Sequence, residues 1–253
     1  MHACISQFFA DALKQLNPKI NWRDHQLFMR VMSASLIGQL FSSLFSLVKE
    51  EAKVKRKMTR TRAGHLFEDV TAQKIYSHAR SLGLRPNPPR HTLTYPTFSG
   101  DSYQFDASFS LADVTYVIEC KRTKMPAKVH IHYFNSQILD YLFGAKIRKD
   151  NLSMKGIFLS TVKVREGSMI YAIANGITVI DPVSPPMEYM LSTLRRGSPL
   201  YRAMIELYRK MPSPAVVFDL DRIDYEPAPD LFREYKFLCK RWRDEYEIVG
   251  KGL

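Results

Sequence analysis

Apolar residues recur every three or four positions over residues 63–82, and this spacing predicts a helix with one buried face. The helix is expected to stop at Gly83, ahead of a proline-rich stretch. Beyond it, short apolar runs predict strands, two of them joined as a hairpin. The expected order is helix, three strands, helix, strand, helix and strand, over residues 63–82, 91–95, 103–110, 114–121, 133–149, 156–160, 167–175 and 177–180. An early hairpin followed by crossovers predicts an α/β fold with a mixed sheet flanked by helices.

The segments on either side of this middle part are predicted to be helical extensions. The first ends in a strongly basic run over residues 49–62, and the second contains helical patterns over residues 201–210 and 230–246. The chain is therefore divided into a helical N-terminal region, a core and a mostly helical C-terminal region, at residues 1–60, 61–183 and 184–253.

One stretch in the first region raises the question of a membrane span. Residues 31–48 contain no charged side chain, and a run of eighteen is at the lower limit for crossing a bilayer. The stretch contains Gln39 and five serines, and its leucines recur at helical spacing. This pattern favours a packed helix of a globular protein, so no membrane is expected among the partners.

Composition indicates a globular protein with a polyanionic partner. Hydrophobic residues make up 45% of the 253 residues, which excludes wholesale disorder. The formal net charge of +12 favours nucleic acid first and an anionic membrane second. Cys4, Cys120 and Cys239 form no CxxC pair, so no four-cysteine metal site or disulfide framework is expected. Together with the absence of signal-peptide features at the start, this favours a cytoplasmic location.

The predicted hairpin carries the candidate chemistry. Side chains alternate along its second strand, so Glu119 and Lys121 share one face while Ile118 and Cys120 share the other. Pairing of the strands brings Asp106 opposite the Glu119 end. Two carboxylates beside an ammonium offer the hard oxygen ligands that suit Mg²⁺, and Mg²⁺ can activate water against a phosphodiester. From the Glu-x-Lys triplet alone, an ordinary pair of surface charges remains the alternative.

The order of the surrounding residues gives this motif its context. Glu68 lies on the preceding helix, and Gln137 and Tyr141 lie four residues apart on one face of the next helix. With Asp106 and the Glu-x-Lys strand between them, this order resembles the PD-(D/E)xK nuclease superfamily, specifically its Mrr-like restriction endonuclease and RecB-like branches. The resemblance covers residues 62–182, about half of the chain.

The resemblance implies a restriction-endonuclease-like fold and a set of metal ligands. Asp106 and Glu119 match the metal-binding carboxylates, and Glu68 matches a helix glutamate that supports the metal or its waters. The backbone carbonyl of Cys120 would be a further ligand. Phe105 stands where the eponymous motif has proline. The implied cofactor is Mg²⁺, for which Mn²⁺ can substitute.

The resemblance also implies the activity and the remaining roles. Lys121 matches the catalytic lysine, and Gln137 and Tyr141 match residues that line the site. The expected activity is Mg²⁺-dependent DNA endonuclease cleavage. Apart from the resemblance, the charge of the basic residues 49–62 and 195–196 predicts that they contact phosphates. Cleavage of both strands would require a homodimer or a partner nuclease.

Other interpretations were weighed against this one. A nucleic-acid-binding protein that keeps the nuclease fold without activity would bind DNA and cut nothing. Residues 216–221 resemble the opening motif of haloacid-dehalogenase-type phosphatases, but Arg222 replaces the usual glycine and few residues follow. His130 and His132 lack a third ligand for zinc, and a basic DNA-facing loop over residues 121–128 is the preferred interpretation there.

Overall fold

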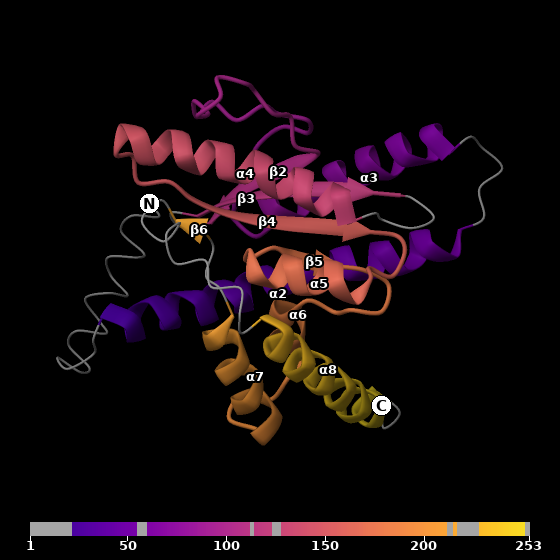
Figure 1. The fold of residues 1–253 in the computed structure, drawn as a ribbon. Coiled ribbons are helices and arrows are strands. Elements are labelled where there is room, and N and C mark those ends of the chain that lie inside the picture. The colour runs from indigo at the N-terminus through magenta and orange to yellow at the C-terminus, as the bar shows by residue number, and fades with distance from the viewer. Residues whose placement is uncertain are drawn as a thin grey trace.

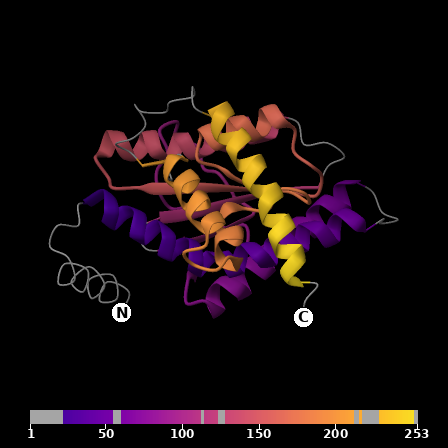
Figure 2. The ribbon, with the colours of Figure 1, turned by 90° about the horizontal axis from the view of Figure 1, so that it is seen from below.

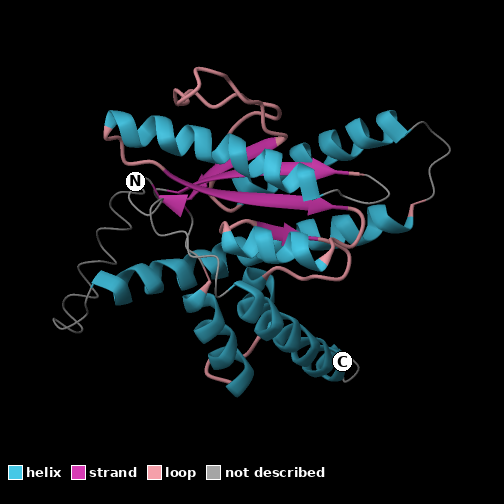
Figure 3. Cartoon of the chain, viewed as in Figure 1, coloured by secondary structure: helices cyan, strands magenta, loops and turns pink. Residues whose placement is uncertain are grey.

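The computed structural model describes residues 22–54, 60–111, 114–122, 128–211, 215–216 and 228–250. Within them, a six-stranded mixed sheet has helices packed on both faces (Figure 1, Figure 3). The helices are α2 (Trp22–Lys53), α3 (Arg60–Ser81), α4 (Lys128–Arg148), α5 (Glu166–Ala174), α6 (Met187–Thr193), α7 (Pro199–Lys210) and α8 (Ala228–Gly250). The strands are β1 (Arg85–Pro86), β2 (Ala107–Leu111), β3 (Val114–Lys121), β4 (Ser153–Ser160), β5 (Thr178–Ile180) and β6 (Ala215–Val216).

The sheet combines an antiparallel half with a parallel half. Strands β1, β2 and β3 pair antiparallel, whereas β3, β4 and β5 pair parallel, in the order β1-β2-β3-β4-β5. Strand β6 adds an antiparallel pair at the beginning of β4. The parallel pairs need helical crossovers, which α4 and α5 supply. The predicted α/β fold with a mixed sheet between helices is therefore confirmed.

Two apolar cores lie on the two faces of the sheet. One face is covered by α4, α5 and the C-terminal helices, and α7 and α8 lie side by side (Figure 2). The other face is covered by α2 and α3. Alternation along β3 sends Val117 into the first core and Ile118 and Cys120 into the second, and all three side chains are fully buried.

The uncharged stretch of residues 31–48 lies inside α2, where its second half is buried against the rest of the protein. Leu40, Leu44 and Leu47 are part of the core beneath α3. Gly38 allows α2 to approach α6 closely, because a Cβ at this position would lie 2.5 Å from the Cβ of Ser192. No helix in the described part of the chain combines the length and apolarity needed to span a bilayer.

Most predicted elements of the core are present, with boundary shifts. The predicted hairpin is present as β2 and β3, and the two apolar strands are present as β4 and β5. The helix predicted before the hairpin is α3. The strand predicted at residues 91–95 is wrong: only a single bridge joins Thr92 to Gln104, and the edge strand is β1. Arg90, with φ 58°, turns the chain out of extended conformation just before that segment. Helix α6, which follows two prolines, was not predicted.

Candidate active site

Hairpin pairing places Asp106 beside the end of β3. Ala107 lies opposite Ile118, so Asp106, one residue earlier, comes level with Glu119. Glu119 and Lys121 lie on the same side of β3 as Val117, facing the α4 layer, and both are partly exposed. The predicted alternation along this strand is confirmed.

The polar groups of this edge are held by direct contacts. The backbone N–H of Cys120 donates a hydrogen bond of 2.7 Å to the Asp106 carboxylate. The Lys121 ammonium forms an ion pair with Glu119 on the same face of the strand. The Cys120 side chain itself is buried in the opposite core, and burial raises the pKa of its thiol well above the usual range. Cys120 therefore contributes to this edge through its backbone N–H and not through its side chain.

Negative charge is in excess at this edge. Burial, together with the carboxylates of Glu119 and Glu68, raises the pKa of Asp106 to about 7. The Cys120 N–H and the Lys121 ammonium oppose this rise without cancelling it. Crowded carboxylates are costly unless a cation or hydrogen bonds offset their repulsion. Three carboxylates facing one ammonium therefore make a place that favours a further cation.

Lys121 is held in its charged form. Burial alone would lower the pKa of its amine, but the ion pair with Glu119 and the charges of Asp106 and Glu68 outweigh burial, and the pKa is raised. The ammonium is consequently present at neutral pH. A charged lysine can orient a water molecule or stabilise an oxyanion, but cannot accept a proton.

Glu68 reaches this cluster from α3, which lies on the other side of the sheet. Its charge acts on Asp106 and Lys121. The Glu68 carboxylate also lies 3.2 Å from His65 Nδ1, one helical turn earlier. The fold thus brings residues of three separate segments within electrostatic reach of one another: Glu68 on α3, Asp106 just before β2, and Glu119 with Lys121 on β3.

Arg90 belongs to the same neighbourhood and was not predicted. Its guanidinium lies 2.8 Å from Asp69 and 4.0 Å from Glu68. Its backbone N–H donates to the carbonyl of Asp106, and its left-handed backbone is held by the Gln104 side chain, which donates to the Arg90 carbonyl at 2.7 Å. Nothing in the sequence around this arginine, which follows two prolines, indicates a place in the site. Only the fold brings it close to the carboxylates.

Gln137 and Tyr141 both lie on the buried face of α4. The Tyr141 hydroxyl donates to the carbonyl of Tyr103 and accepts from its N–H, both at 3.4 Å, and the Tyr141 ring packs against Phe105. Tyr141 therefore holds the segment that leads into Asp106. A direct role of either residue toward a substrate stays a prediction.

The residues at this edge fit a divalent cation that keeps part of its water shell. In the described part of the chain, no three His, Cys, Asp or Glu side chains form a ready-made metal site. Mg²⁺, however, is usually bound through one or two carboxylates, with waters completing its octahedron. Asp106 and Glu119 supply those carboxylates. Burial and the neighbouring carboxylates raise the pKa of Asp106, and a bound cation would offset the negative charge gathered there.

The predicted basic loop after β3 is placed only in part. Arg122 does not face outward: its guanidinium pairs with Glu51 at 3.3 Å and donates to the carbonyl of Val54, tying β3 to the end of α2. Residues 123–127 lie outside the described part. His130 and His132 lie on α4, and the His132 ring stacks on the Tyr171 ring with their centroids 3.7 Å apart.

The other predicted features of the flanks are described only partly. Residues 195–196 form an exposed turn after α6. The basic run at 49–62 has its centre, residues 55–59, outside the described part, and the same holds for most of residues 216–221.

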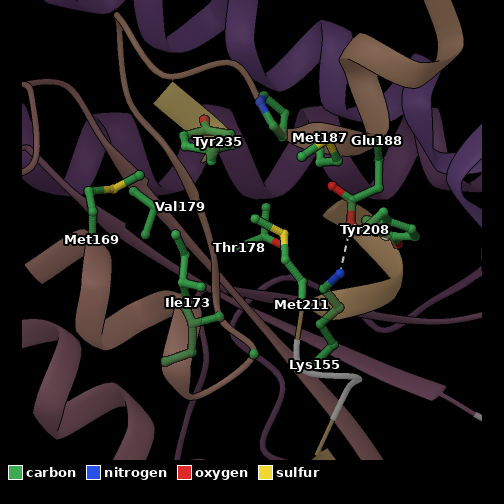
Figure 4. Close-up of a pocket in the computed structure, with 13 residues that line it drawn as sticks. Lys155, Met169, Ile173, Thr178, Val179, Met187, Glu188, Tyr208, Met211 and Tyr235 are labelled. Carbon is green, nitrogen blue, oxygen red and sulfur yellow. Dashed lines mark hydrogen bonds and ion pairs between the residues drawn. The ribbon is translucent and has the colours of Figure 1, made fainter. Parts of the chain in front are cut away.

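A separate cavity of about 60 Å³ lies at the opposite end of β4 (Figure 4). Lys155 and Glu188 form a buried ion pair of 2.7 Å there, and the Tyr208 hydroxyl donates to the same carboxylate oxygen at 3.2 Å. Most of the other lining side chains are Met, Ile and Val, joined by Thr178, Pro186 and Tyr235. Lys155 lies near the start of β4, whereas Lys121 is level with Ser160 at its end, so the two charged groups are separated along the sheet.

No protein-family model and no curated protein matches the sequence. Among solved structures, the small subunit of the heterodimeric restriction endonuclease R.BspD6I is similar over 78% of this chain and 98% of its own, with 15% identity and a TM-score of 0.41. A protein of unknown function, AF1548, is similar over 68% of this chain and 96% of its own, with 15% identity and a TM-score of 0.33. Both similarities are distant, and the function is therefore inferred from the side chains of this chain.

Proposed function

We propose that this protein is a Mg²⁺-dependent DNA endonuclease whose active site is the edge formed by Asp106, Glu119 and Lys121. The observation that supports this most is the convergence of two carboxylates and a charged lysine from paired strands, with Glu68 adding negative charge from α3. The net charge of +12 suits a polyanionic substrate. The order of these residues is that of the PD-(D/E)xK superfamily, which the sequence resembles.

In this proposal Asp106 and Glu119 hold the metal, together with the backbone carbonyl of Cys120, and Glu68 orients its waters. Bound Mg²⁺, or Mn²⁺ in its place, would lower the pKa of a water and stabilise the charge that develops on the phosphate. The Cys120 N–H fixes the Asp106 carboxylate, so the ligand is positioned before substrate arrives.

The side chains around the metal ligands would position the substrate and the attacking water. Lys121, charged at neutral pH, orients the attacking water and stabilises the extra negative charge on the phosphoryl oxygens. The water oxygen bonds to phosphorus and releases a proton to the surrounding solvent, one ester P–O bond breaks, and the leaving oxygen takes up a proton from a solvent water. Arg90 is placed to contact a phosphate once it leaves Asp69.

Cleavage assays test the proposal. Purified wild-type protein is incubated with supercoiled, linear and branched DNA in Mg²⁺, in Mn²⁺ and in EDTA. Asp106→Asn, Glu119→Gln and Lys121→Met should each lose cleavage while keeping the far-UV spectrum and DNA affinity of wild type. Asp230→Asn and Arg233→Met, an exposed ion pair on α8, are matched controls and should cut normally. Equal cutting by all five variants would refute the site.

A second candidate is a nucleic-acid-binding protein without activity. The feature that favours it is the ion pair between Lys121 and Glu119, because the lysine already occupies the carboxylate that a metal would need. This candidate predicts that wild type binds DNA in a salt-sensitive way, and that neither wild type nor any variant cleaves DNA in Mg²⁺ or Mn²⁺.

A further inference from the structure

The outward face of α4 carries an exposed apolar stripe. Val129, Tyr133, Phe143 and Ile147 are exposed by 62%, 60%, 44% and 66%. Eleven large hydrophobic side chains are exposed in the described residues, and these four lie on a single helix. The gaps between them are four, ten and four residues, which are sums of threes and fours, so the four side chains lie on one face. Exposed stripes of this kind mark interaction surfaces more often than isolated apolar residues do.

The types of side chain along the stripe follow the same order when the stripe is read from either end. Val129 and Ile147 each lie nine residues from position 138, and Tyr133 and Phe143 each lie five residues from it. Between them on the same face come the polar residues Ser136 and Asp140, each two residues from position 138. The sequence along the face is therefore aliphatic, aromatic, polar, polar, aromatic, aliphatic.

We infer that this stripe is the contact between two copies of the chain. Their α4 helices pack antiparallel, and the two-fold axis crosses the stripe level with position 138, whose own side chain points into the core. Two-fold symmetry requires that if residue i contacts residue j, then j contacts i. In this register Val129 meets Ile147 of the second copy, and Tyr133 meets Phe143 of the second copy. A partner of different sequence would not require the face to match itself on reversal.

A neighbouring loop extends the same surface. Tyr95 and Phe98 are exposed by 44% and 65%, and their loop is fastened to the middle of α4. The Ser99 N–H and hydroxyl both donate to the Asp140 carboxylate, and the Phe98 N–H donates to the Asp140 carbonyl at 3.0 Å. Gly144 makes room for the loop, because a Cβ there would lie 2.7 Å from the Pro96 carbonyl oxygen.

The size of this surface predicts a weak dimer. At 1.5 Å per residue the stripe is about 27 Å long, and a helix about 10 Å wide gives roughly 300 Å² per copy. A standard interface buries about 800 Å² per partner, so the loop must contribute and the dissociation constant should be micromolar. The inference stands without the nuclease proposal, although two joined active sites would suit cleavage of both strands of a duplex.

Disulfide cross-linking of the full-length protein tests the register. Val129→Cys/Ile147→Cys should give a covalent dimer on mild oxidation, because the two positions face each other across the contact. Val129→Cys alone should not, since two copies of position 129 would lie about 27 Å apart. Val129→Cys/Phe143→Cys, out of register by about 6 Å, should cross-link much more slowly. Unmodified protein shows any contribution of the native cysteines, of which Cys120 and Cys239 are buried.

Charge replacement gives an independent measurement. Sedimentation should show that wild type dimerises with a micromolar dissociation constant and that Tyr133→Glu raises this constant at least about tenfold. Tyr133→Glu/Phe143→Lys should recover dimerisation, because opposite charges then meet across the contact and lie too far apart to pair within one helix. A monomer at every concentration, equal cross-linking in both registers, or no recovery in the double variant would each overturn the inference. None of these readouts depends on DNA cleavage.

Discussion

Two charged clusters on neighbouring strands of the sheet differ in their balance of charge. At the end of β3, the Lys121 ammonium faces Asp106, Glu119 and Glu68, and the edge is partly open to solvent. At the start of β4, Lys155 faces the single carboxylate of Glu188, and both are buried. The closed pair has one positive and one negative charge, so its net charge is zero. The open edge is short of positive charge, which is what the proposed metal site would need in order to receive a cation.

The largest predicted difference is in catalysis. Lys121→Met should reduce the DNA cleavage rate by about 10²–10³-fold or more, because a charge that stabilises the transition state is lost. Glu188→Gln should leave the cleavage rate of the folded protein within about twofold, since the closed pair lies at the other end of β4. Rates measured under single-turnover conditions decide this. Equal losses in the two variants would abolish the distinction between the clusters.

The next largest difference is in folding stability. Glu188→Ala leaves the buried Lys155 ammonium without a counter-charge, so the free energy of unfolding should fall by about 3–5 kcal/mol. Urea denaturation followed by circular dichroism measures this fall. Asp230→Ala, which removes an exposed ion pair on α8, should cost less than about 1 kcal/mol. A similar small cost for Glu188→Ala would show that the pair is not buried in solution.

Removing both charges of the closed pair tests whether the loss of stability in Glu188→Ala comes from the unpaired buried charge. Lys155→Met/Glu188→Leu should recover most of the loss and unfold within about 1–2 kcal/mol of wild type, because apolar side chains of similar volume replace a desolvated pair. The comparison uses the same denaturation assay, with each single variant measured beside the double. A double variant as unstable as Glu188→Ala would instead indicate that Tyr208 and the pair act as one hydrogen-bonded network.

The smallest effect concerns the cost of excess negative charge at the open edge. The folded-state pKa of Asp106 is about 7 against an ordinary 3.8, so the folded protein binds this proton more tightly than the unfolded chain does. Stability should therefore decrease as pH rises from about 4 to 7 and then level off. Asp106→Asn removes that cost and should stabilise the metal-free protein above pH 7, with little effect near pH 4. Thermal melting in EDTA across this range is the measurement, and a variant less stable than wild type at pH 8 would contradict it.

The sequence alone predicts the middle of the fold because its signals there are local. Alternation in residues 114–121 separates the side chains of β3 into two faces, so Glu119 and Lys121 share one face with Val117. The helical spacing of residues 63–82 likewise predicts α3. These patterns depend on near neighbours along the chain, so they can be recognised without knowing the tertiary structure.

The features that the sequence did not predict depend on contacts between distant residues. Arg90 reaches the carboxylates because a left-handed turn and the Gln104 side chain place it there. The inward turn of Arg122 depends on Glu51, which lies 71 residues earlier. The closed pair joins Lys155 to Glu188 on a short helix that was not expected. None of these pairings leaves a periodic signal in the chain.

The account depends most on the open edge being able to capture a divalent ion. Titration of the full-length, DNA-free protein with Mn²⁺, followed by electron paramagnetic resonance of the free ion, measures that capture directly. Wild type should bind one ion per chain at this edge, and Asp106→Asn and Glu119→Gln should each weaken binding by at least about tenfold, whereas Asp230→Asn should not. Unchanged Mn²⁺ binding in both edge variants, or no binding by wild type, would contradict the account.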